Sequence, residues 1–102
     1  MTDIKKLKVM VVDDTIVYRK IVTDILSELP DVEVVGTANN GKIALNKIAS
    51  LKPDLITLDI EMPEMNGLDV LALIQKEHPD TEVIMLSTST REGGEMTIRA
   101  LE

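Results

Sequence analysis

The chain has no cysteine, tryptophan or phenylalanine among its 102 residues, and Tyr18 is its one aromatic residue. The absence of cysteine excludes disulfides and thiolate metal ligands. The scarcity of aromatic side chains argues against the stacking platform on which single-stranded nucleic-acid binders hold bases. Since 44% of the residues are nonetheless hydrophobic, we expect a packed core of aliphatic residues and methionine.

Basic residues are also few, 11 against 18 acidic ones, which gives a formal charge of −7. Such a chain gains nothing from counterion release on DNA or RNA, so nucleic-acid binding is disfavoured. The excess of carboxylates suits a divalent cation if several of them converge. No hydrophobic run is long enough for a signal peptide or a membrane span. We therefore expect a cytoplasmic protein without membrane insertion, and one domain over residues 1–102.

Short apolar runs alternate with helical patterns along the chain. The runs cover residues 9–12, 32–38, 55–58 and 83–86, and the second is interrupted as edge strands often are. Helical spacing follows each run, starting near residues 15, 41, 68 and 92, and the last pattern extends to residue 101. This alternation is typical of a parallel sheet, and runs that are apolar at every position indicate burial on both faces. The predicted fold class is α/β, a doubly wound parallel sheet.

Polar residues stand at the carboxyl ends of these expected strands. Asp13 and Asp14 follow the first strand, Asp59 the third, and Ser87 and Thr88 the fourth. Ligands bind at this edge of open α/β sheets, and in the order 2-1-3-4 the first and third strands are neighbours, roughly 5 Å apart. Three carboxylates would therefore meet in one crevice, which is costly unless a cation neutralises them. Mg2+ is the usual cation where phosphate is also present.

The formation of an aspartyl phosphate requires a carboxylate nucleophile, a cation and donors for the phosphoryl oxygens, and residues for each stand at these strand ends. An ionised aspartate can attack phosphorus, and the Ser87 hydroxyl with nearby loop N–H groups could hold the phosphoryl oxygens. Taken singly, Asp13 or Asp14 is more simply a helix N-cap, and Asp59 a loop carboxylate. Their joint position at the ligand-binding edge favours a functional site.

Three motifs in this order resemble bacterial response-regulator receivers. They are Val-Val-Asp-Asp at 11–14, Thr-Leu-Asp-Ile-Glu-Met-Pro-Glu-Met-Asn-Gly at 57–67, and Met-Leu-Ser at 85–87. The resemblance covers essentially the whole chain and implies a flavodoxin-like fold. Residues 33–38, 57–63, 83–87 and 95–102 look most like the receivers of chemotaxis methylesterases, which are protein-glutamate methylesterases and glutamine deamidases.

The resemblance implies a role for each site residue. Asp59 would accept a phosphoryl group from a phosphohistidine of a chemotaxis-type histidine kinase. Asp14 and Asp59 would bind Mg2+ directly together with the backbone carbonyl of Glu61, and Asp13 would bind it through water.

At the end of the fourth strand, Ser87 would be the switch hydroxyl and the Thr88 backbone would contact the phosphoryl group. The chain alone would be a regulatory phosphoacceptor that controls an attached methylesterase and deamidase domain. That hydrolase domain is not among these residues.

The resemblance also predicts what this chain lacks. Receivers of the family continue into a fifth strand that ends in a lysine, and then into a fifth helix. No lysine follows Lys76 here, so we expect a domain incomplete at its C-terminus, without the fifth strand and fifth helix. The fourth strand would then be an exposed edge, open to pairing with another chain or a swapped segment.

Three alternatives remain at the level of the sequence. The chain could be the receiver of another response regulator. It could be a Mg2+-dependent phosphohydrolase, although such enzymes often carry Asp-x-Asp where this chain has adjacent Asp13 and Asp14. It could also be an interaction-only pseudo-receiver, which the missing lysine favours and the intact Asp59 and Ser87 disfavour.

Overall fold

The centre of the fold is a five-stranded sheet in the order β2-β1-β3-β4-β5. The computed structural model describes residues 5–62, 65–89 and 95–101, with side chains through Leu86. Strands β1 (Leu7–Val12), β2 (Val32–Ala38), β3 (Leu55–Asp59) and β4 (Glu82–Ser89) run parallel. The predicted order 2-1-3-4 of the parallel strands is confirmed, and β2 lies at the edge as its interrupted pattern indicates.

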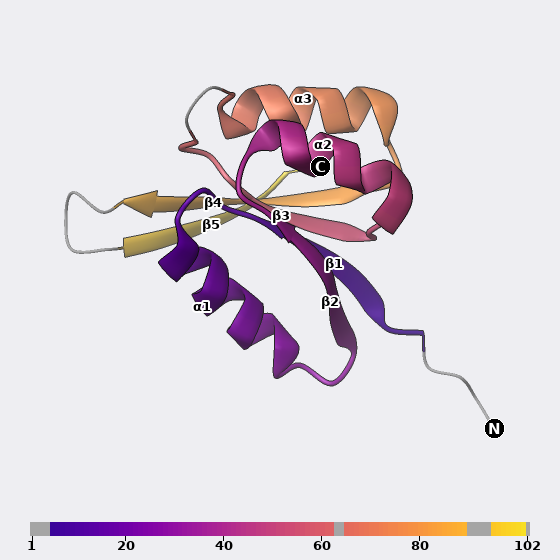
Figure 1. Ribbon diagram of the computed structural model, residues 1–102, viewed down its shortest axis with the longest axis vertical. Helices are drawn as coiled ribbons and strands as arrows, with labels where there is room; N and C mark the ends of the chain where they lie inside the picture. Colours follow the sequence, from indigo (N-terminus) through magenta and orange to yellow (C-terminus); the bar gives the residue numbers. More distant parts are fainter. Residues whose placement is uncertain (1–4, 63–64, 90–94, 102) are drawn as a thin grey trace.

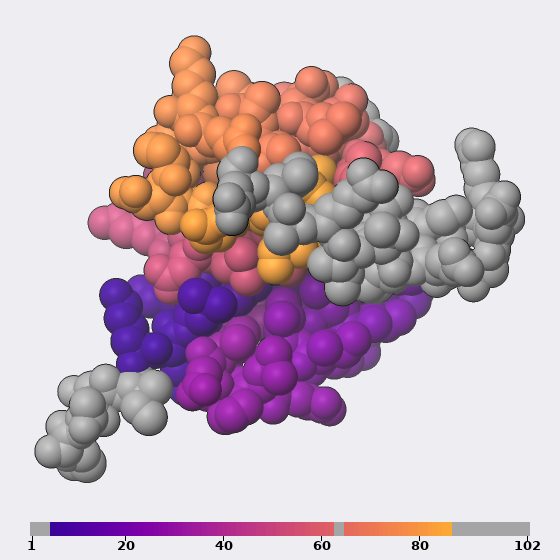
Figure 2. Space-filling model, turned by 180° about the vertical axis from the view of Figure 1, so that it is seen from behind, coloured from indigo at the N-terminus to yellow at the C-terminus, as the bar shows by residue number. Residues whose placement is uncertain are grey.

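Three helices of the described residues cover the two faces of this sheet (Figure 1). Helix α1 (Ile16–Ser27) lies on one face, and α2 (Gly41–Leu51) and α3 (Gly67–Glu77) lie on the other. Figure 2 shows this division from behind, with the indigo-to-purple N-terminal residues below and the orange residues of α3 above. None of the helices in the described ranges is long and apolar enough to cross a membrane.

Side-chain caps fix where α2 and α3 begin. The Oδ1 atom of Asn40 accepts a hydrogen bond from the Ile43 N–H at 2.8 Å, and Asn66 does the same for Asp69 at 3.0 Å. Each cap satisfies one of the N–H groups that have no partner within the helix. Helix α1 begins without such a cap from the side chain of its N-cap residue, Thr15. The Thr15 N–H instead donates to Asp13 Oδ1.

The apolar core is divided between the two faces of the sheet. The larger cluster lies on the side of α2 and α3 and includes Met10, Ile56, Leu58, Ile74 and Met85. The smaller cluster, on the side of α1, consists of Val11, Val22 and Leu86 with partly buried neighbours.

The apolar spacing of α1 identifies its packed face only in part. Val22 is buried against the sheet, whereas Val17, Ile21 and Ile25 are 59%, 40% and 56% exposed. The reason is that α1 is the one helix described on this side and lies against β1 and β2. Its other flank therefore has no partner among the described residues.

Residues 95–101 form a strand, β5 (Glu95–Leu101), where the apolar spacing predicts a helix over 92–101. Strand β5 pairs antiparallel with β4, from Ser89 opposite Glu95 to Val83 opposite Leu101 (Figure 1). The prediction of a helix is wrong for these residues, and so is the expectation that β4 forms an exposed edge, because the antiparallel β5 covers it. The part of the predicted helix at 92–94 lies outside the described residues.

Two physical reasons favour the strand. Met96, Ile98 and Ala100 alternate with polar residues in this segment. This period of two is typical of a strand, and the segment is too short for its apolar residues to favour a helix instead. Pairing also satisfies the N–H and C=O groups of β4 that would otherwise form an open edge. The edge that the sequence leaves exposed is thus covered by the chain itself.

Candidate functional site

Three carboxylates meet at the carboxyl ends of β1 and β3. Each of Asp13, Asp14 and Asp59 offers an oxygen, and these three oxygens lie within 4.8 Å of one another. The two strands are paired, with Val12 opposite Leu58, so the residues that follow reach the same edge of the sheet. Asp13 and Asp59 are 1% exposed, while Asp14 is exposed. The convergence that the sequence predicts is confirmed, and we call these three residues the acid cluster.

One oxygen of Asp13 is held and the other is not. Its Oδ1 accepts from the Thr15 N–H at 2.8 Å, whereas Oδ2 is buried with no hydrogen-bond partner in the described structure. Burial raises the pKa of Asp13 above its usual value, and the charge of Asp14 adds to this, while the Thr15 N–H and Arg19 oppose it. A buried carboxylate oxygen without a partner is costly, and it is the kind of ligand that a hard cation binds.

Asp59 experiences the same crowding more strongly. Burial, followed by the charge of Asp13 and the contact with Asp14, raises the pKa of Asp59 to about 7. The Glu61 N–H, which donates to Asp59 Oδ1 at 3.1 Å, opposes this shift. Without added positive charge, Asp59 would therefore be partly protonated at neutral pH.

The loop after β3 is held close to Asp59 by Gly67. The Gly67 N–H donates to the Ile60 carbonyl at 2.9 Å. A Cβ atom at this position would clash with the carbonyl oxygen of Asp59 and would lie 2.8 Å from the Ile60 Cα. Since backbone atoms cannot move aside as a flexible side chain can, only glycine allows α3 to begin against the acid cluster.

The remaining predicted site residues lie around this edge. Glu61 follows Asp59 by two residues, in the loop where the resemblance places a metal-binding carbonyl. Asp59 is opposite Leu86 in β4, so Ser87 is the next residue along the neighbouring strand. The side chains of Ser87 and Thr88 lie outside the described part, and their roles stay predictions.

Arg19 was not identified from the sequence, although it adjoins the cluster. Its Nη1 atom donates to the backbone carbonyl of Asp13 at 2.9 Å. The available signal is its place in the first turns of the helix that follows Asp13, because long side chains on a helix point back toward its N-terminus. Thr57, two residues before Asp59, is a second unpredicted feature, since its buried hydroxyl has no partner in the described structure.

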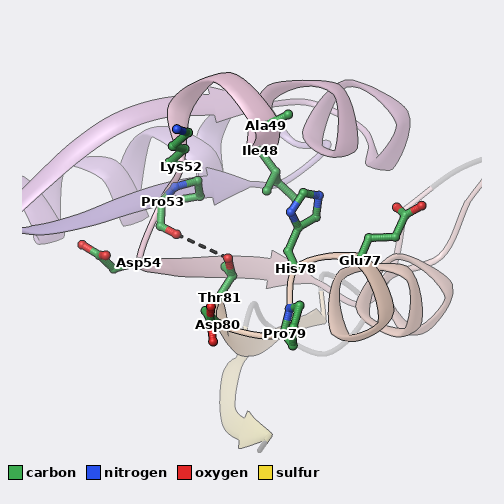
Figure 3. A pocket seen from close by; sticks show the side chains of 10 residues that line it. All are labelled: Ile48, Ala49, Lys52, Pro53, Asp54, Glu77, His78, Pro79, Asp80 and Thr81. Atoms are coloured by element: carbon green, nitrogen blue, oxygen red, sulfur yellow. Dashed lines mark hydrogen bonds between the residues drawn. The ribbon is translucent and has the colours of Figure 1, made fainter.

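A pocket of about 550 Å3 lies at the amino ends of the strands, opposite the acid cluster and beside the C-terminal ends of α2 and α3 (Figure 3). Its carboxylates, from Asp54, Glu77 and Asp80, point in different directions. That of Asp54 already accepts from the Lys8 N–H at 2.9 Å. In the described part of the chain, the acid cluster is the group of carboxylate and histidine side chains whose atoms lie close enough together to hold a metal ion.

Comparison with known sequences identifies relatives of this chain. The family described as response regulator receiver domain matches residues 9–102. The protein-glutamate methylesterase/protein-glutamine glutaminase of Desulfotalea psychrophila is 61% identical over 99 residues, which cover 96% of this chain and 27% of that protein. The protein of the same name from Geobacillus kaustophilus is 54% identical over 98 residues, 96% of this chain and 28% of that protein. The chain thus spans just over a quarter of the length of these relatives.

Solved structures give the same relationship. The response regulator domain of Thermotoga maritima CheB is 47% identical with a TM-score of 0.78, over 88% of this chain and 66% of that one. A chain of the CheX–CheY–BeF3–Mg2+ complex from Borrelia burgdorferi is 31% identical with a TM-score of 0.77, over 86% and 69% of the two chains. With its acid cluster at the carboxyl edge of a 2-1-3-4 sheet, the chain belongs to the family of response regulator receiver domains, where it is homologous to the receivers of CheB methylesterases.

Proposed function

We propose that Asp59 is the residue of this receiver that accepts a phosphoryl group. The observation that carries the proposal is the convergence of Asp13, Asp14 and Asp59 at one edge of the sheet, with the Asp59 side chain buried. A carboxylate held this way has a fixed orientation and is partly desolvated, whereas an aspartate in a solvated loop has neither property.

Different residues of the chain would act at different points of the phosphoryl transfer. The Glu61 N–H holds Asp59 Oδ1, which leaves the second oxygen to attack phosphorus. The bond from that oxygen to phosphorus forms while the bond from phosphorus to the donor histidine nitrogen breaks, and the imidazole leaves as a neutral ring that keeps the proton already on its other nitrogen. The Ser87 hydroxyl would meet the transferred group, and the Thr88 backbone would contact it.

Mg2+ fits the acid cluster. Asp14 and Asp59 would hold it directly with the backbone carbonyl of Glu61, and Asp13 would hold it through water. When bound, it supplies positive charge that offsets the crowded carboxylates and the phosphoryl oxygens. The buried Oδ2 of Asp13 without a partner and the raised pKa of Asp59 support this assignment, as does the related receiver whose complex carries Mg2+ and BeF3.

The relatives suggest what the phosphorylated receiver controls. They carry the name protein-glutamate methylesterase/protein-glutamine glutaminase and are nearly four times as long as the matched region. We therefore propose that this chain regulates an attached methylesterase domain in the cytoplasm, and that its phosphoryl donor is a chemotaxis-type histidine kinase. The phosphoryl group carries about −1.5 to −2 charge in place of the single charge of an ionised Asp59 carboxylate and brings new acceptor oxygens, which is enough to favour one of two loop arrangements.

The test is to count phosphoryl groups on the intact chain. This chain, and a longer polypeptide that includes the methylesterase domain, are incubated with acetyl phosphate with and without Mg2+. Intact-mass spectrometry is expected to find one Mg2+-dependent phosphoryl group, absent from Asp59→Asn and retained in Asp31→Asn, which removes an exposed carboxylate elsewhere. A phosphoryl group that persists in Asp59→Asn would place the acceptor at another residue, and none on either polypeptide would favour an interaction-only domain; both results would contradict the proposal. Repeated turnover of an aryl phosphate would instead indicate a phosphohydrolase.

A further inference from the structure

A second, smaller pocket adjoins the acid cluster on its β2 side. It has a volume of about 200 Å3 and is lined by Arg19, Thr37, Ala38, Asn39, Ile43 and Lys47. The Ala38 carbonyl accepts from the Asp13 N–H at 3.1 Å, so the wall of this pocket is hydrogen-bonded directly to a residue of the acid cluster. The pocket and the cluster are neighbours on the same edge of the sheet.

Two cations point into this region with donor capacity to spare. Arg19 Nη1 donates to the Asp13 carbonyl at 2.9 Å, and Lys47 Nζ donates to the Thr37 carbonyl at 2.6 Å. A guanidinium has five N–H donors and an ammonium has three, so each uses one of several in the described structure. The ion pair found in the described residues joins Lys20 to Asp24, and no carboxylate of those residues lies within bonding distance of Arg19 or Lys47.

The N-terminus of α2 adds to the positive potential. Ile43, which lines the pocket, is in the first turn of this eleven-residue helix, whose N-cap is Asn40. The N-terminal end of a helix carries a partial positive charge. The pocket of Figure 3 differs, because its lining combines Lys52 with three carboxylates. In a chain of net charge −7, the smaller pocket is a local concentration of positive charge with no acidic side chain in its lining.

We propose that this pocket binds a small oxyanion group, a carboxylate or a phosphate, between the guanidinium of Arg19 and the ammonium of Lys47. A guanidinium can donate two parallel hydrogen bonds to such a group, and the pocket has room for a few heavy atoms. A molecule anchored here would extend toward Asp13 and the acid cluster. The inference stands apart from phosphorylation of Asp59, since it concerns binding alone.

The simpler explanation is that both cations only satisfy backbone carbonyls and offset the charge of the acid cluster. That explanation predicts no saturable anion site. Binding of sulfate and of acetate to this chain is therefore measured by NMR of the backbone amides of residues 37–43. The solution contains no divalent metal, so that the acid cluster repels anions, and ionic strength is held constant with sodium chloride.

We expect saturable shifts of these amides with a dissociation constant on the order of millimolar, weaker by about tenfold in Lys47→Gln and Arg19→Gln. Lys76→Gln, which removes a positive charge from the far end of α3, is expected to bind as the unmodified chain does. Lys47→Arg should restore binding and shows that the loss in Lys47→Gln is not a folding defect. Tighter binding of sulfate would point to a phosphate ligand, and tighter binding of acetate to a carboxylate of a partner. Shifts that do not saturate, or equal affinity in Lys47→Gln, would overturn the proposal.

Discussion

At the scale of single residues, the burial of Asp59 couples its ionisation to the stability of the fold. Its pKa is about 7 in the folded chain, against about 3.9 for an aspartate in an unfolded chain. Between roughly pH 4 and pH 7 the folded state therefore binds more protons than the unfolded state. The free energy of unfolding falls as the pH rises through this window, by at most about 4 kcal/mol for a shift of this size.

Replacing Asp59 with asparagine removes this proton-linked term. In metal-free solution, we expect Asp59→Asn to raise the free energy of unfolding at pH 8 by about 1–3 kcal/mol, because Asp13 shares the crowding and part of the shift. The gain should shrink as the pH falls and disappear below about pH 3, where the carboxyl is protonated in both the folded and the unfolded state. Urea unfolding at several pH values measures this, with Asp31→Asn as the charge-matched control. An Asp59→Asn variant that is no more stable than the unmodified chain at pH 8 would show that Asp59 is not destabilised by its neighbours.

At the scale of elements, the sequence was sufficient for the parallel part of the sheet and for the acid cluster. Four apolar runs predicted the four parallel strands. The polar residues directly after these runs predicted which carboxylates converge. The same reasoning failed for residues 95–101, because a short segment can fit both periods and its partner strand decides between them. It also missed the pocket of Arg19 and Lys47, since the reach of a long side chain depends on rotamer and packing rather than on spacing along the chain.

The pairing of β5 with β4 can be tested with proline at two adjacent positions. The N–H groups of an edge strand point alternately toward its neighbour and away from it. Of Thr97→Pro and Ile98→Pro, one must therefore remove a hydrogen bond of the ladder while the other leaves it intact. We expect hydrogen exchange of the β4 amides to accelerate about tenfold or more in one variant and much less in the other. If residues 95–101 were helical, both prolines would break the helix and neither would single out the amides of β4.

At the scale of the whole molecule, the chain combines a net charge of −7 with three carboxylates gathered at one edge of the sheet. Both features favour a bound cation, but in different ways. A diffuse negative charge is screened by any salt, whereas a converging set of oxygen ligands selects a hard divalent ion. Stability measured with different cations can therefore separate a true site from general screening.

Mg2+ is expected to raise the melting temperature of this chain by an amount that depends on Asp14. A ligand at 100 times its dissociation constant stabilises the folded state by about 2.7 kcal/mol, and each kcal/mol shifts the melting temperature by about 4–8 °C in a domain of this size. Asp14→Asn removes an exposed carboxylate of the acid cluster without disturbing the core, so most of the Mg2+-dependent shift should disappear if Asp14 holds the ion. Asp31→Asn, with the same change in net charge, should keep it, and sodium chloride at equal ionic strength should produce little of it. An equal shift in all three proteins would assign the effect to screening of the acidic surface and would remove the acid cluster as a magnesium site.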